Sequence, residues 1–213
     1  MSRILAVLLC LACGGRGQGA DVQPDTDNVM IGEEAFDVFE LVPETTVCSP
    51  TTSANGYKDL CDGTIQAPDL RLWEKASSYQ SWDEAKSRCE DLVLAGKDDW
   101  RLPDIDELRG LILGCPKTHV SGSCGVHANP KCTEEKKCFS KEDCWPCSMN
   151  GGPGGNGSYL DPLFLEPDRM YWSSTMAEMV MAEKRAWGVS FYDGNVRVAP
   201  VTDFQQARCV RGP

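Results

Sequence analysis

The cysteine content is the feature that most constrains how this chain can fold. Twelve of its 213 residues are cysteine. Proteins of the reducing cytosol seldom carry so many unless the thiolates bind metal, whereas exported domains use cysteines to form disulfides. The chain is therefore either a metal-binding protein or an exported domain stabilised by disulfides, and its N-terminus helps to separate these two classes.

The first residues are typical of an export signal. An apolar run extends from Ile4 to Ala12, and it is far shorter than the roughly 20 apolar residues of a membrane-spanning helix. We therefore expect residues 1–12 to be a signal peptide. Cys13 follows a small residue and precedes two glycines. This pattern resembles the cleavage site of bacterial lipoproteins, in which the cysteine receives a lipid.

Two kinds of processing are compatible with this N-terminus. Lipidation of Cys13 would leave a lipoprotein at the outer membrane or cell surface, attached to the membrane only through its N-terminal lipid. Ordinary cleavage, for example after Gly19, would instead release a soluble secreted protein. Residues 13–30 contain several glycines and no aromatic side chain, so we expect a flexible tether. Either route places the chain in an oxidising compartment.

Export leaves ten cysteines for the mature domain, an even number that five disulfides would use completely. Six of them lie in a segment with few large apolar side chains, which cannot fold on hydrophobic burial alone. We therefore predict that disulfides stabilise this segment, although the sequence leaves their pairing open. The ten residues are Cys48, Cys61, Cys89, Cys115, Cys124, Cys132, Cys138, Cys144, Cys147 and Cys209.

Zinc binding and redox chemistry are the alternatives to structural disulfides. Cys132, Cys138, Cys144 and Cys147 could supply four thiolates, but only the last two have the close spacing that zinc sites usually repeat. The same two residues are spaced as in a thiol–disulfide redox motif, but no predicted helix follows them to lower the pKa of a thiol. We expect neither a metal nor a cofactor.

Two helices are predicted in the body of the chain. The first spans Ser81–Ala95, is capped by its serine, and places Cys89 and Val93 on its buried face. The second spans Asp104–Gly114, and Glu107 completes a capping box at its start. Both helices end at or before a glycine, as helices commonly do.

Alternating apolar and polar residues predict short strands before and after the helices. The Asp193-Gly194 pair is typical of a type I′ hairpin turn. We predict an α+β domain with two helices packed on a small antiparallel sheet and a long disulfide-rich loop insert. The predicted strands are Leu70–Trp73, Met170–Ser174, Ala186–Phe191, Val196–Val201 and Ala207–Arg211.

Several short motifs occur in an order that is specific in combination. They are Leu72-Trp73, Leu94-Ala95-Gly96, Asp99-Trp100-Arg101-Leu102-Pro103, Tyr171-Trp172-Ser173-Ser174-Thr175, Ala186-Trp187 and Arg208-Cys209-Val210-Arg211. With these motifs the chain resembles the Lcl C-terminal domain family, the domain at the end of collagen-like bacterial surface adhesins. The resemblance implies a C-type-lectin-like fold, which formylglycine-generating enzymes also use.

The resemblance also implies how the domain is organised. A cysteine in the first helix, Cys89, would pair with Cys209 in the last strand. With six cysteines in the insert, Cys48 and Cys61 are then the remaining pair, and we expect them to tie down the entry segment. The domain would span residues 31–213. Its main departure from many family members is the cysteine-rich insert at residues 115–157, where lectin-like domains carry their ligand-contacting loop.

Ligand contacts in such a fold would come from the insert and the loop that follows it. The candidates are Tyr159, Asp161, Glu166 and Asp168. Glu166 and Asp168 also resemble part of a calcium motif of lectin-like domains. With Asp193 and Asn195 they form a weak candidate calcium site, since acidic loop residues in an acidic chain are most often solvated.

No arrangement of catalytic residues is evident from the sequence. The two histidines, His119 and His127, lie near no obvious nucleophile, and we expect both at the surface. The formylglycine-generating enzymes use reactive cysteines near the chain end, whereas the only cysteine there, Cys209, is assigned by the resemblance to a structural disulfide. We therefore expect a protein that is not an enzyme.

The charge of the chain limits the classes of partner that we expect. A net charge of −11 excludes a nucleic-acid-binding protein, which needs a basic surface. Some relatives bind sulfated polysaccharides, but an acidic chain repels polyanions. We expect a non-catalytic binding or adhesion module, secreted or anchored at the surface, for an extracellular glycan or protein. The alternatives are an oxidase of the formylglycine-generating type and a purely structural envelope lipoprotein.

Overall fold

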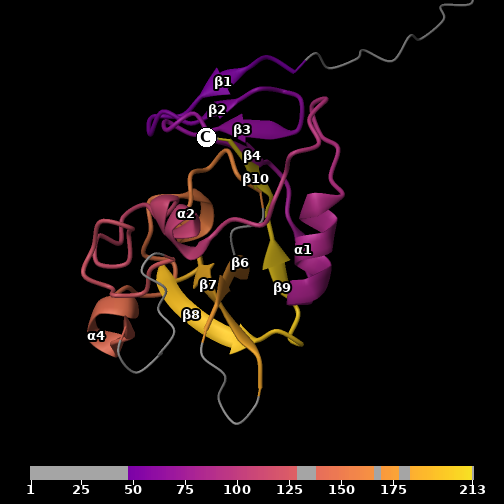
Figure 1. Cartoon of the computed structure of the whole chain (residues 1–213). Helices are drawn as coiled ribbons and strands as arrows, with labels where there is room; N and C mark the ends of the chain where they lie inside the picture. The colour runs from indigo at the N-terminus through magenta and orange to yellow at the C-terminus, as the bar shows by residue number, and fades with distance from the viewer. Residues whose placement is uncertain (1–47, 129–137, 166–168, 178–182, 213) are drawn as a thin grey trace, which may run out of the picture. The chain divides into compact units, whose positions relative to one another are not determined.

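The computed structural model describes residues 48–128, 138–165, 169–177 and 183–212 (Figure 1). The chain divides into two units, Met1–Thr45 and Thr46–Pro213, and all the described residues belong to the second. The predicted signal peptide, tether and domain start lie outside the described residues, as do Cys13, Cys132, Glu166 and Asp168. Among the described residues, no helix has the length and apolar character needed to span a membrane.

Short strands build two five-stranded sheets rather than the single sheet that we predicted. The first sheet has the order β1-β2-β3-β4-β10, and neighbouring strands are antiparallel. It lies at the top of Figure 1, where the chain's first described strands meet its last. Its strands are β1 (Thr51–Thr52), β2 (Lys58–Asp59), β3 (Thr64–Gln66), β4 (Leu72–Glu74) and β10 (Val210–Arg211).

The second sheet has the order β5-β9-β6-β7-β8. Its pairs are antiparallel except for β6 and β9, which run parallel. Its strands are β5 (Ser78–Gln80), β6 (Met170–Met176), β7 (Arg185–Ser190), β8 (Asn195–Pro200) and β9 (Gln205–Ala207). The predicted α+β class is therefore confirmed, but the strands form two sheets where the sequence pattern indicated one.

The last predicted strand is divided because the chain passes from one sheet to the other. β9 ends at Ala207, and β10 starts at Val210 in the other sheet. Between them, the buried Arg208 guanidinium donates hydrogen bonds to the carbonyl groups of Glu74, Lys75 and Leu165. These contacts fix the crossing and separate two strands that the apolar pattern had joined.

Helix α1 (Trp82–Glu90) is shorter than predicted. Leu94 and Lys97 pair across a tight turn, in which Ala95 and Gly96 have φ angles of 52° and 68°. This turn ends the helical pattern early and leaves Val93 71% exposed instead of buried. α1 packs against β5 and β6 in the second sheet.

Helix α2 (Ile105–Gly110) starts as predicted. The Asp104 carboxylate accepts a hydrogen bond from the Glu107 backbone at 2.8 Å, and the Glu107 carboxylate accepts one from the Asp104 backbone at 2.9 Å. The Ile105 backbone N–H donates to the Thr175 hydroxyl of β6 at 3.0 Å. These bonds fix the start of α2 on the second sheet, where the helix packs against β6 and β7.

The remaining regular elements lie in the insert and in the β7–β8 connection. The insert contains α4 (Lys141–Cys144) and a short 3-10 helix, η1 (Gly155–Gly157). Ser190 pairs with Asn195, so a four-residue loop joins β7 to β8. The predicted two-residue type I′ turn is wrong, because Gly194 alone of its pair has a positive φ, at 65°.

Four disulfides join pairs of described cysteines. Cys89–Cys209, the pair that the resemblance implied, and Cys48–Cys61, the pair expected for the entry segment, are both confirmed. In the insert, Cys115 pairs with Cys147 and Cys124 pairs with Cys144. Cys138 is disulfide-bonded as well. The two closely spaced cysteines of the insert therefore belong to separate disulfides, which argues against both the zinc and the redox interpretation.

Candidate functional site

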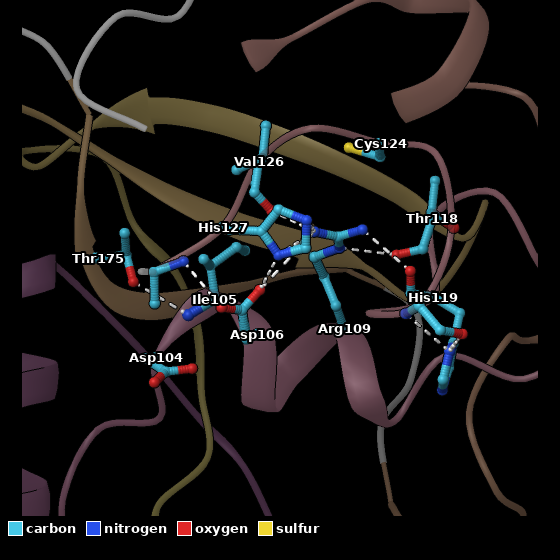
Figure 2. Close-up of polar contacts among 12 residues, drawn as sticks. Asp104, Ile105, Asp106, Arg109, Thr118, His119, Cys124, Val126, His127 and Thr175 are labelled. Carbon is cyan, nitrogen blue, oxygen red and sulfur yellow. Dashed lines mark hydrogen bonds and ion pairs between the residues drawn. The ribbon is translucent and has the colours of Figure 1, made fainter. Parts of the chain in front are cut away.

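A fully buried arginine on α2 organises the first half of the insert. Arg109 donates from Nε to the Thr118 carbonyl and from Nη2 to the His119 carbonyl, both at 2.9 Å, and from Nη1 to the Val126 carbonyl. Figure 2 shows the guanidinium reaching from the helix into the insert segment. Burial lowers the pKa of Arg109 to about 10, so the side chain stays charged at neutral pH.

Asp106, one turn before Arg109, holds the other end of this segment. Its carboxylate contacts Nδ1 of His127 at 2.7 Å and accepts a hydrogen bond from the Ala128 backbone at 2.9 Å (Figure 2). It also lies 3.7 Å from the Arg109 guanidinium. The carboxylate thus compensates part of the buried positive charge while it fixes the chain at His127.

Both histidines are partly buried rather than free at the surface. The His119 carbonyl accepts from Arg109, and burial together with the guanidinium charge lowers the pKa of its imidazole. His127 contacts both Asp106 and Arg109. Both histidines lie where the insert folds back onto α2, and both keep partial exposure to solvent.

A cavity of about 350 Å³, which we call the α2 cavity, lies beside this network. One side is formed by α2 and the insert, and the other by the segments around β2, β3 and β4. Its lining residues are Tyr57, Ala67, Pro68, Asp69, Arg71, Trp73, Asp104, Asp106, Glu107, Gly110, Leu111 and Val120. It is of the size that small-ligand sites commonly have.

The buried arginine positions one wall of this cavity. Val120 lines the α2 cavity and directly follows Thr118 and His119, whose carbonyl groups are bound by Arg109. The wall is therefore held by charge-assisted hydrogen bonds inside the protein, which are stronger than neutral ones. A wall fixed in this way needs little ordering when a ligand enters the cavity.

Glu107 contributes a firmly paired carboxylate to the cavity. It accepts hydrogen bonds from both Nη atoms of Arg101, at 2.6 and 2.7 Å, and lies 3.1 Å from Nε of Arg71. Burial raises the pKa of Glu107, but these partners and the Asp104 backbone N–H outweigh it and lower the pKa overall. Burial raises the pKa of the neighbouring Asp104. Glu107 therefore stays ionised at neutral pH, with its carboxylate held by fixed partners.

The facing wall combines aromatic rings with an ion pair. The Arg71 guanidinium pairs with Asp69. Burial and nearby carboxylates raise the pKa of the Tyr57 phenol, which therefore remains protonated. The buried indole N–H of Trp73 has no hydrogen-bond partner among the described residues. The α2 cavity thus offers apolar ring surface, carboxylate oxygens and a guanidinium within one space.

Gly110, the last residue of α2, leaves this cavity open. A Cβ atom built on Gly110 would meet no atom within 4 Å, so neither packing nor backbone geometry requires a glycine there. Glycine inside a helix costs about 1 kcal/mol relative to alanine. A residue that weakens the helix without relieving a clash is consistent with a need for open space at this wall.

Two of the predicted ligand contacts are tied into the protein interior. Tyr159 is 2% exposed and donates its hydroxyl to the Ser148 carbonyl. Asp161 is 1% exposed and accepts hydrogen bonds from the side chains of Ser53 and Asn55 at 2.7 and 2.9 Å. Burial and pairing leave neither side chain free for a ligand, so this structure does not support them as contacts.

The proposed calcium ligands do not form a cluster in the described structure. Asp193 is buried and paired with Arg197, and Asn195 is buried beside the same hairpin loop. The other two candidates, Glu166 and Asp168, lie outside the described residues. Within the described ranges, no group of three or more His, Cys, Asp or Glu side chains gathers as metal ligands would.

Comparison with known proteins places this architecture in a family. The sequence model of the Lcl C-terminal domain matches residues 66–211, from the end of β3 to the end of β10. None of the curated proteins compared with the chain matches it. The family match includes α1, α2, the insert and the whole second sheet. The chain therefore belongs to the Lcl C-terminal domain family.

Proposed function

We propose that this domain is a non-catalytic binding or adhesion module for an extracellular glycan or protein, and that its ligand enters the α2 cavity. The observation that carries the proposal is the construction of that cavity. One wall is fixed by the buried Arg109, and another is left open by Gly110. Preorganised concave sites with a few polar groups are typical of ligand binding.

The charges of the cavity favour neutral or cationic ligand groups. Asp69, Asp104, Asp106 and Glu107 line it, against the single guanidinium of Arg71. A sulfate or carboxylate group would therefore meet mostly like charges. Hydroxyl groups of a sugar and amino or hydroxyl groups of a protein side chain could donate to the carboxylate oxygens, which accept several hydrogen bonds each.

A C-type-lectin-like arrangement and export to the cell surface are parts of the same proposal. β10 pairs with β4, and Cys209 is bonded to Cys89, so the end of the domain returns to its beginning. This closure supports the lectin-like arrangement. The disulfides support an exported domain, because such bonds persist in oxidising compartments. Mass analysis of the mature N-terminus would test lipidation of Cys13 and separate the anchored form from the secreted one.

The oxidase alternative requires reactive thiols. Each cysteine in the described part of the chain is disulfide-bonded, and Cys89 and Cys209 are bonded to each other. An oxidised cysteine cannot act as a nucleophile, so this pairing favours the binding module. Mass mapping of disulfides without reduction would test the point, and two free thiols close in space would restore the oxidase alternative.

The direct test of this proposal is to measure glycan binding by a variant in which a side chain blocks the α2 cavity. The mature protein is applied to a glycan array, with and without calcium and over a range of salt concentrations. Gly110→Leu places a side chain into the α2 cavity, whereas Gly155→Leu adds the same side chain at an exposed glycine whose surroundings are equally open. We expect Gly110→Leu to weaken binding at least ten-fold and Gly155→Leu to leave it unchanged.

The remaining outcomes distinguish the alternatives. Equal binding by the two leucine variants would contradict the assignment of the ligand to the α2 cavity. Absence of binding to glycans and to extracellular matrix proteins, by the unmodified protein, would favour the purely structural envelope lipoprotein. Binding that rises with the anionic charge of the glycan would contradict the argument from the acidic lining.

A further inference from the structure

An exposed tryptophan in the insert is held rigidly at the edge of the second sheet. Trp145 is 40% exposed, yet its indole N–H donates to the Val196 carbonyl at 2.7 Å. The Phe139 ring packs edge-on against it, with 5.2 Å between ring centroids. The residues on either side of Trp145-Pro146 are Cys144 and Cys147, which belong to two different disulfides.

This ring borders a second hollow, distinct from the α2 cavity. The hollow measures about 420 Å³ and shares no lining residue with the α2 cavity. Beside Trp145 it is lined by Ser190 of β7, Arg197 and Val198 of β8, and Gln205 of β9. We call it the Trp145 hollow. A hydroxyl, a guanidinium and a carboxamide thus surround one aromatic ring.

The charges around the ring are mostly compensated. The Arg197 guanidinium lies 5.4 Å from the centre of the Trp145 ring and is paired with the buried Asp193. Lys141 of α4 places its ammonium 5.5 Å from the same ring, and it is an exposed residue with a flexible side chain. A contact of this kind at an exposed site is weak, so a ligand can displace the lysine.

This combination matches the chemistry of a sugar ring. A pyranose has an apolar face of C–H groups that packs on an indole, and a rim of hydroxyls that need both donors and acceptors. Gln205 and Ser190 offer both, and Arg197 offers donors. Because the indole is already fixed, little side-chain entropy is lost on binding. The paired guanidinium provides no unbalanced charge that would select an anionic sugar.

We propose that the Trp145 hollow is a binding subsite for a neutral pyranose, stacked on Trp145 with its hydroxyls on Gln205, Ser190 and Arg197. This inference names a ligand class for the proposed binding function and rests on that function, but it does not depend on the α2 cavity. It gives the disulfide-rich insert a direct role, because the insert delivers the aromatic ring to the sheet edge.

The experiment is an NMR titration of the ¹⁵N-labelled mature protein with the methyl glycosides of glucose, galactose and mannose. We expect at least one of them to shift the Trp145 indole and Gln205 carboxamide resonances saturably. Trp145→Ala should weaken the binding of that sugar at least ten-fold. Gln205→Ala, which keeps the aromatic ring, should weaken the binding several-fold. Tyr79→Ala removes an exposed aromatic ring outside the hollow and should bind as the unmodified protein does.

Folding and binding failures are separated by the design. Spectra of Trp145→Ala report whether the second sheet is intact, and Gln205→Ala tests the hollow if that variant is misfolded. The inference is overturned if no glycoside moves these resonances, or if the shifts persist unchanged in both variants. Loss of glycan binding in Gly110→Leu but not in Trp145→Ala would overturn the inference as well while leaving the proposed function standing, whereas loss of binding in both variants would support both.

Discussion

The carbonyl group of Thr118 accepts a hydrogen bond from Nε of Arg109 at 2.9 Å, and both residues are fully buried. This single bond joins α2 to the start of the disulfide-rich insert. Together with the bonds to His119 and Val126, it anchors the first half of the insert to α2 through a charged side chain. The stability of the insert should therefore depend strongly on Arg109.

Replacing Arg109 with methionine tests this dependence. Arg109→Met keeps most of the apolar volume but removes the donor to the buried Thr118 and Val126 carbonyl groups, one of two donors to the His119 carbonyl, and the guanidinium beside Asp106. We expect the free energy of unfolding to fall by about 3 kcal/mol or more, as measured by urea denaturation with the disulfides intact. Arg169→Met, at an exposed position, should change it by less than about 0.5 kcal/mol. Equal losses would contradict a special role for Arg109.

The Cys89–Cys209 disulfide should contribute more stability than the Cys48–Cys61 disulfide. The first closes a loop with a sequence separation of 120 residues, the second one of 13. In the chain-entropy model such loops correspond to about 4.7 and about 3 kcal/mol. We expect the double alanine variant of the long-range pair to unfold at the lower urea concentration. The reverse order would indicate that the entry segment, rather than chain closure, limits stability.

Two glycine-to-alanine substitutions should have opposite effects. A Cβ at Gly110 meets open space, whereas a Cβ at Gly188 would lie 2.2 Å from the Tyr171 carbonyl oxygen in the neighbouring strand. Gly110→Ala should raise the free energy of unfolding by up to about 1 kcal/mol, and Gly188→Ala should lower it by about 1–3 kcal/mol. Thermal or urea unfolding of the two variants checks both signs, and destabilisation by Gly110→Ala would refute the open-space argument.

The stabilising contribution of Glu107 should be lost in acid. Its hydrogen bonds with Arg101 and the Asp104 backbone, opposed by burial, lower its pKa below the ordinary value of 4.5. The unfolded chain therefore binds a proton more readily, and stability increases with pH in this range. The contribution is complete above pH 4.5 and is lost as the pH falls through the lower folded pKa. Asp104, whose pKa is raised by burial, acts in the opposite direction.

The variant Glu107→Gln isolates this contribution, because glutamine can still close the capping box. Its free energy of unfolding should depend less on pH below pH 4.5 than that of the unmodified protein. Urea denaturation at a series of acidic pH values provides the measurement. Glu90→Gln, at the exposed end of α1, should follow the unmodified curve. Parallel curves for all three proteins would show that Glu107 is not the source of the acid sensitivity.

Local features of the fold could be predicted from the sequence, because neighbouring residues determine them. The capping box formed by Asp104 and Glu107 is an example, since its hydrogen bonds span three residues. The length of α1 could not be predicted in the same way. Val93 continues the apolar helical pattern, but the turn between Leu94 and Lys97 removes it from the helix.

The candidate site could not be assembled from the sequence, because distant segments form it. Tyr57 and Arg71 reach Glu107 and Gly110 only after the first sheet has folded beside α2. A prediction based on the position of a loop in the sequence selected Tyr159 instead, and this side chain is buried in the folded domain. One local signal was available, namely a charged residue next to the apolar stripe of α2, and Arg109 is that residue.

Three disulfides of this domain are nested along the sequence. Cys124–Cys144 lies inside the loop closed by Cys115–Cys147, and both lie inside the loop closed by Cys89–Cys209. In the proposed export, with the N-terminus leading, Cys89 emerges first of these six and its partner last. The outermost bond must therefore wait until the chain is almost fully secreted, or form by reshuffling of an earlier wrong pair. Maturation of this domain should accordingly be sensitive to the supply of disulfide isomerase.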